Sequence, residues 1–184
     1  MKLLSHILNR LHVKLEFPSV FVTDWKRKLL SEIEAQQAAD VPLTDIVRYL
    51  DQQCAQLHRK AEGLGKGAVH SDRQLNAHTA TMKRAQFIDQ QRGQLYQVMV
   101  GRNLKGQELE RAGQVDEAIV LYEANLRDQF DDAYPYDRLR IIYTRRQDYR
   151  NAIRACRAYL SLPDGTVGHD KARFRYQLEK LLAR

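Results

Sequence analysis

Three glycines within five residues, Gly63, Gly65 and Gly67, surround Lys66 and resemble a phosphate-binding loop in composition. A dinucleotide-binding loop needs the spacing Gly-x-Gly-x-x-Gly, and a P-loop needs Ser or Thr directly after its Gly-Lys pair. Here the spacing is Gly-x-Gly-x-Gly, and Gly67 follows Lys66. Neither pattern is met, so the stretch 63–67 predicts a mobile loop without a bound nucleotide.

Two small groups of side chains have types that suit metal binding or acid–base chemistry. Cys54 and His58 are four residues apart on one predicted helix face, but no second ligand pair follows at zinc spacing. A core Cys beside a partly exposed His is therefore the favoured interpretation. His70, Asp72 and His78 cluster near the glycine loop without a nucleophile or second carboxylate. We expect no catalytic residue, no metal and no cofactor, and hence no enzyme.

Seven arginines gather between positions 138 and 157, where Asp148 is the one acidic residue and Asp137 directly precedes the stretch: Arg138, Arg140, Arg145, Arg146, Arg150, Arg154 and Arg157. Arg150, Arg154 and Arg157 recur at i, i+4 and i+7, which places them on one helix face as a candidate polyanion-binding surface. The alternative is a solvated surface. It is favoured because no aromatic residues or recognition motif accompany the arginines.

The elements that carry these residues are predicted to be helices. The 184 residues favour one domain, or one with a small appendage, and 43% hydrophobic residues suffice for a core. Gly and Pro together number 13, about 7% of the chain against about 12% in average usage. Because breakers are scarce and apolar residues recur at helical spacing, an all-α fold is expected.

The net charge, the apolar runs and the cysteine content limit which partners and which cell compartment are expected for the protein. The net charge of +7 is spread along the chain and permits only weak binding to polyanions. The longest apolar run, Ala118 to Tyr122, is far short of the roughly 20 residues that cross a bilayer, so no membrane association is expected. The apolar stripe in residues 2–12 is interrupted by polar residues and lacks a cleavage site, which indicates a helix. Two cysteines are too few for a disulfide framework, so a reducing cytoplasm is the expected location.

An internal repeat organises the second half of the chain. The pair Ala118-Ile119 recurs as Ala152-Ile153 at a 34-residue offset. The same offset aligns Leu109 with Tyr143, Val115 with Tyr149, Tyr122 with Cys156, and Leu126 with Leu160.

A 34-residue period resembles the tetratricopeptide repeat, in which pairs of antiparallel helices stack on one another. The residues that match the family pattern are Gly106, Leu109, Ala118 and Tyr122 in the first unit, 99–132, and Tyr136, Leu139, Tyr143 and Ala152 in the second, 133–166. The match is partial: Arg102 and Lys105 occupy positions that are usually apolar, and Arg140 and Tyr159 replace small residues. The resemblance covers residues 99–184 and implies an α-α hairpin repeat stack.

Residues 167–184 are predicted to cap this stack with one helix, whose apolar stripe is Phe174, Leu178, Leu181 and Leu182. Extending the period upstream places Arg84 at the small-residue position and Arg92 at a Leu position. No third unit of this type is therefore expected before residue 99.

The first hundred residues predict an N-terminal helical region, 1–72, followed by a connecting helix, 73–98. Helices are expected over 24–38, after Thr23, and over 44–62, with Thr44 as N-cap. Ser71 or Asp72 is expected to cap the helix that follows the glycine loop. Residues 12–22 fit either a short edge strand or an extended connector.

The resemblance implies a non-enzymatic scaffold that binds a peptide or partner helix in a groove along the first helix of each pair. The implied groove residues are Asn103, Gln107, Glu110, Arg111, Tyr134, Asp137, Ile141 and Arg145, accompanied by Val100 and Thr144. Asn103 and Gln107 replace the Lys and Asn of a carboxylate clamp, and Asp137 would repel a carboxylate, so a mixed polar ligand is expected rather than an acidic tail. The alternative is a nucleic-acid-associated protein that uses Arg150, Arg154 and Arg157. The sequence leaves the oligomeric state open.

Overall fold

The computed structural model describes residues 23–65, 71–163 and 171–184. Within these ranges the chain forms seven α-helices and no strand: α2 Asp24–Ala38, α3 Leu43–Leu64, α4 Asp72–Arg111, α5 Val115–Arg127, α6 Ala133–Arg145, α7 Tyr149–Leu160 and α8 Lys171–Leu182. The predicted all-α class is confirmed. The helix expected over 2–12, the segment 12–22, and part of the glycine loop lie outside the described residues. No helix in the described ranges is both long and apolar enough to cross a membrane.

The long helix α4 joins two compact units, which meet in the sequence between Gln97 and Val98. The connecting helix predicted over 73–98 and the first helix of the first repeat are thus one continuous element. Gly93 and Gly101 both lie inside it. A glycine in a helix interior costs only about 1 kcal/mol relative to alanine, which is too little to interrupt a helix of this length.

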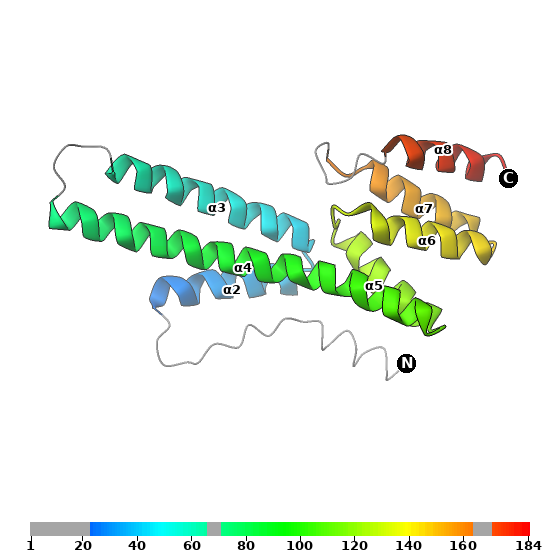
Figure 1. Cartoon of the computed structure of the whole chain (residues 1–184), viewed down its shortest axis with the longest axis horizontal. Coiled ribbons are helices and arrows are strands. Elements are labelled where there is room, and N and C mark those ends of the chain that lie inside the picture. The colour runs from blue at the N-terminus through cyan, green and yellow to red at the C-terminus, as the bar shows by residue number, and fades with distance from the viewer. Residues whose placement is uncertain (1–22, 66–70, 164–170) are drawn as a thin grey trace. The chain divides into compact units, whose positions relative to one another are not determined.

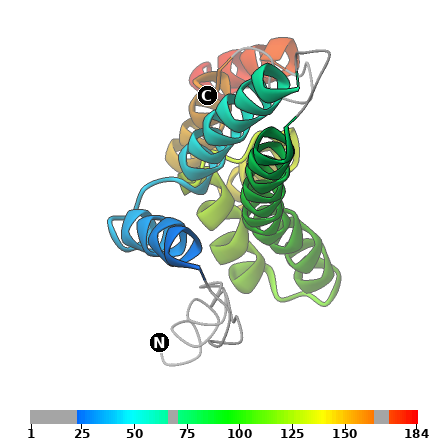
Figure 2. The ribbon, with the colours of Figure 1, turned by 90° about the vertical axis from the view of Figure 1, so that its left-hand side faces the viewer.

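The described part of the first unit, which lies between residues 23 and 97, packs α2, α3 and the N-terminal part of α4 around a small apolar core. Two contacts tie α3 to α4: the Cys54 thiol donates to the carbonyl oxygen of Ala85 at 3.7 Å, and Arg92 donates to Asp51 at 2.7 Å. Figures 1 and 2 show these two helices next to each other. The core residues are Leu29, Ile33, Leu43, Ile46, Leu50, Ala61, Ala85, Ile88 and Leu95.

The helix ends in this unit correct two predictions and confirm one. Helix α3 begins at Leu43 after Pro42, without a side-chain cap, so Thr44 is not the N-cap. Leu43 is buried, and packing of this residue extends the helix by one position. The helix also continues through Gly63 to Leu64, past the predicted start of the loop. Ser71 caps α4 as predicted, with its hydroxyl accepting from the backbone N–H of Gln74 at 3.3 Å.

The described part of the second unit, which begins at residue 98, stacks helices α5 to α8 on the end of α4. Figure 1 shows α6, α7 and α8 following one another as neighbours. Two apolar clusters fill this stack. One contains Ala118, Tyr122, Leu139, Ile142 and Ala155, and the other contains Ala133, Tyr136, Ala152, Cys156, Tyr159, Leu162, Phe174 and Leu181.

Candidate functional site

The helix-turn-helix connections of the second unit repeat in the structure at the same 34-residue offset as the sequence. Helix α4 ends at Arg111 and α5 begins at Val115, while α6 ends at Arg145 and α7 begins at Tyr149. Both turns contain a residue with positive φ, 78° at Gly113 and 60° at Gln147.

Both turns also close with the same pair of backbone hydrogen bonds, typical of the Schellman motif. The N–H of Gly113 donates to the carbonyl of Glu110 at 3.0 Å, and that of Gln147 donates to Thr144 at 3.1 Å. The next N–H in each turn reaches back five residues, at 2.8 Å from Gln114 and 2.9 Å from Asp148. The turns within the two hairpins therefore share one backbone conformation.

Residues at equivalent positions of the two hairpins are buried in the same way. Ala118 and Ala152 are completely buried, and so are Tyr122 and Cys156. Burial raises the pKa of the Cys156 thiol to about 11, against an opposing effect of the nearby Arg140 guanidinium. Cys156 is therefore a neutral core residue at physiological pH.

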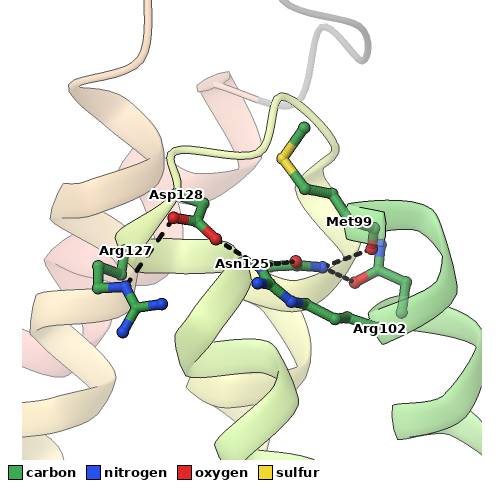
Figure 3. Close-up of polar contacts among 6 residues, drawn as sticks. Met99, Arg102, Asn125, Arg127 and Asp128 are labelled. Atoms are coloured by element: carbon green, nitrogen blue, oxygen red, sulfur yellow. Dashed lines mark hydrogen bonds and ion pairs between the residues drawn. The ribbon is translucent and has the colours of Figure 1, made fainter. Parts of the chain in front are cut away.

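A buried polar network connects α4 to α5 (Figure 3). Arg102 and Asp128 form an ion pair in which the side chains are only 7% and 6% exposed. Asn125 lies beside the pair, and its amide donates to the carbonyl of Met99 at 2.8 Å and to the side-chain oxygen of Asn103 at 2.9 Å. Arg102 places a charge at a position that is usually apolar in the repeat pattern, and its partner Asp128 explains how that charge is tolerated.

Asn103, predicted to line the groove, belongs to this network instead. Its side chain is buried, accepts from Asn125 and donates to Asp132 at 3.2 Å. Because both ends of the amide are engaged inside the protein, we leave Asn103 out of the candidate site.

Glu110 also has partners within the fold. Arg138 donates to it at 3.0 Å through Nε and again through its second guanidinium nitrogen, and the Tyr122 hydroxyl donates at 2.8 Å. Desolvation by burial raises the pKa of Glu110, but the hydrogen bonds from Arg138 and Tyr122 outweigh it, so the pKa lies below its ordinary value. Glu110 is an anionic link between α4, α5 and α6. No local pattern in the sequence pairs it with Arg138, because the two residues lie on different helices.

Asp137 links α6 to α8. It accepts from Arg140 at 2.7 and 2.9 Å and lies 3.4 Å from the guanidinium of Arg173. Arg140 also donates to Gln177 at 3.4 Å. Asp137, which was predicted to face a ligand, thus contributes to the contact between α6 and α8.

The other predicted groove residues are more accessible than Asn103. Arg111 and Arg145 are exposed, while Gln107, Tyr134 and Ile141 are half-buried. Arg111 and Arg145 occupy equivalent positions of the repeat, as the last residues of α4 and of α6. A mixed, partly apolar surface therefore remains along α4 and α6. Asn103, Glu110 and Asp137 do not belong to it, because their side chains are bonded within the protein.

The three arginines of the predicted polyanion surface line one groove on α7, which we call the α7 groove. Its volume is about 1010 Å³, and its lining is Arg150, Asn151, Ile153, Arg154, Arg157, Ala158, Ser161 and Leu182. Leu182 was predicted to belong to the apolar stripe with which the last helix caps the stack, but the residue is 56% exposed and lines this groove. Leu181 is the buried neighbour, and Leu182, about 100° further around the helix, lies on its exposed side.

His70 lies outside the described residues, and the other residues singled out for metal-binding or acid–base chemistry are not assembled into a site within the described ranges. The Cys54 thiol is turned to a backbone carbonyl of α4, and His58 is exposed. In the ranges that the structure describes, no three His, Cys, Asp or Glu side chains come together at metal-binding distances.

No family model matches the chain, and no curated protein or solved structure shows significant similarity to it.

Proposed function

We propose that the chain is a non-enzymatic protein-binding module related to the tetratricopeptide repeats, and that it holds a peptide or partner helix along the first helices of its two hairpins. The observation that carries this proposal is the 34-residue repetition of helix ends, positive-φ turns and buried alanines. Hairpins of one conformation that stack in such repeats carry their first helices on the same side, which creates a continuous surface for an extended partner. The hydrogen bond from Arg138 on α6 to Glu110 on α4 supports this arrangement here. The two free cysteines, Cys54 and Cys156, fit a reducing cytoplasm as its location.

The residues that we assign to this surface are Gln107, Arg111, Tyr134, Ile141 and Arg145. They combine two guanidinium groups with an aliphatic and an aromatic side chain, which suits a partner with both polar and apolar contacts. Asn103, Glu110 and Asp137 hold the framework behind them.

A photo-crosslinking experiment tests the proposed surface. A photoreactive amino acid replaces Gln107 in one variant and Lys105 in a matched control. Lys105 is exposed on the same helix and lies two residues away, about 200° around the helix axis. Nuclease-resistant crosslinks to protein at position 107 that are absent at position 105 are the expected result. Equal crosslinking at both positions, or crosslinks lost on nuclease treatment, would contradict the proposal.

Nucleic-acid binding is a second candidate function, favoured by the three arginines on one face of α7. If Arg150, Arg154 and Arg157 neutralise about three phosphates, they contribute about −2 to −3 to the slope of log affinity against log salt. Replacing all three with Gln should then remove that part of the slope, measured with a short duplex and a single strand. Arg154 already pairs with Glu123, which leaves two arginines without an ion pair in the described part of the chain. Protein binding is therefore the first proposal.

A further inference from the structure

The α7 groove combines positive charge with apolar contact area. Arg150, Arg154 and Arg157 follow one another along the helix at i, i+4 and i+7, and none of the described residues that line the groove carries a carboxylate. Arg154 is held by Glu123, which also accepts from the Tyr143 hydroxyl at 2.7 Å. This arrangement fixes the middle guanidinium, while its side chain stays 43% exposed.

The apolar part of the groove consists of Ile153, Ala158 and Leu182. Ile153 and Ala158 are partly buried against the core of the stack, whereas Leu182 projects from the end of α8 with 56% of its surface exposed. The groove therefore offers apolar contact area directly beside three guanidinium groups.

We propose that the α7 groove docks an acidic amphipathic helix of another protein. In this arrangement the carboxylates of the partner face Arg150, Arg154 and Arg157, and its apolar side chains cover Leu182 and Ile153. Charge complementarity selects the sign of the partner and speeds encounter, while the apolar contacts hold it in place.

Two other occupants fit the groove less well. A nucleic acid would use the guanidinium groups but leave Leu182 uncovered, and the lining residues within the described part of the chain include no aromatic side chain to stack on bases. The segment 1–22 of this chain holds three basic residues, Lys2, Arg10 and Lys14, against Glu16 and no other acid. That segment therefore carries the wrong charge for the groove.

The α7 groove and the surface on α4 and α6 use different residues, so this inference is independent of the proposed function. Crosslinking at position 107 can therefore fail while the α7 groove binds its partner. Binding at the α7 groove can likewise fail while crosslinking at position 107 succeeds.

Fluorescence anisotropy with designed probes tests the proposal on the full chain. The first probe is a helical peptide of about 16 residues with Leu at spacings of three and four and Glu at most other positions. The second has the same Glu residues, with each Leu changed to Gln. The third is a single-stranded DNA of similar charge. Each is measured at about 50 mM and about 200 mM salt.

The parent protein should bind the Leu/Glu peptide at least about tenfold more tightly than the Gln/Glu peptide, since burial of several leucines separates them. The triple variant R150Q/R154Q/R157Q should bind the Leu/Glu peptide about tenfold or more weakly than the parent does, and the salt dependence of that binding should become flatter. L182S should lower the affinity for the Leu/Glu peptide about three- to tenfold and leave the salt dependence of binding unchanged. R175Q, an exposed change on α8 outside the groove, is the control and should bind as the parent does.

Three results would overturn the proposal: no binding of the Leu/Glu peptide, equal binding of the two peptides, or DNA binding at least as tight as peptide binding that L182S does not alter. The last result would assign the groove to nucleic acid. Because Leu182 is exposed at the end of its helix, L182S should melt like the parent, which separates lost binding from lost folding.

Discussion

Gly106 allows the close packing of α4 against α5. A methyl group at this position would lie 2.5 Å from Cε1 of Tyr122, whose ring is completely buried. The equivalent positions of the second hairpin are Arg140 and Cys156, a large residue beside a small one. Arg140 is accommodated there because its guanidinium is bonded to Asp137 and to Gln177 on α8, while the smaller Cys156 takes the place of the Tyr122 ring.

The substitution Gly106→Ala should destabilise the protein by about 1–3 kcal/mol, because the added methyl group must displace a packed aromatic ring. Gly101→Ala is the matched control on the same helix, since nothing lies within 4 Å of a methyl group there. It should be neutral or stabilise by up to about 1 kcal/mol. Urea unfolding of the two variants measures the difference. Equal stability of the two would show that Tyr122 moves aside freely.

The buried pair of Arg102 and Asp128 should be more costly to break than to remove. Asp128→Leu leaves an unpaired guanidinium in the core and should destabilise by about 3–5 kcal/mol. The double variant R102M/D128L removes both charges and should recover a large part of that loss. Chemical denaturation of both variants and the parent measures these values. A double variant no more stable than Asp128→Leu alone would mean that the ion pair itself, and not the unpaired charge, determines the cost.

At the scale of elements, the two hairpins depend on small residues where their helices approach. Ala118 on α5 and Ala152 on α7 are completely buried, each in one of the two apolar clusters. The positive-φ residues Gly113 and Gln147 set the direction in which the second helix of each hairpin leaves its turn. The two turns adopt the same conformation and the same backbone hydrogen bonds although one has Gly and the other Gln at the positive-φ position.

Ala118→Leu and Ala152→Leu should each destabilise by about 1–3 kcal/mol or more, because the added atoms have no space at the helix crossing. Ala172→Leu, on an exposed position of α8, is the control and should change stability by less than about 0.5 kcal/mol. Thermal melts followed by circular dichroism at the helical minimum give the comparison. Melting of both core variants at the temperature of the parent would show that the 34-residue alignment has no packing basis.

At the scale of the whole molecule, the chain divides into two units that each have their own core, and α4 contributes to both. The described part of the first unit has α2 and α3 as its other helices, and that of the second has α5 to α8. Contacts within a unit determine its resistance to local opening, so the two units should differ in their response to a local change.

Hydrogen exchange of the Ala152→Leu variant tests this division. Amide protection should fall within residues 98–184, where the substituted residue packs, and remain close to that of the parent in α2 and α3. The measurement is exchange followed by mass spectrometry of peptides from both units. A uniform loss of protection in both would mean that α4 couples them into one cooperative unit.

The amino-acid sequence by itself determined the helical class, the start of α2, the Ser71 cap of α4 and the 34-residue repeat that relates Ala118 to Ala152. These features depend on local signals, namely helical periodicity, capping residues and a short repeated pattern. Such signals also placed Arg150, Arg154 and Arg157 on one helix face, and the structure lines a single groove with them.

Only the tertiary structure decided that Asn103 is buried, that Arg102 pairs with Asp128, and that Leu182 faces outward while Leu181 faces the core. The period of a helix shows which of its side chains share a face, but not which neighbouring helix that face meets. Partners on separate helices, such as Asn125 with Met99 and Asn103, come together through the packing angle between helices, and the volume and charge of both surfaces set that angle.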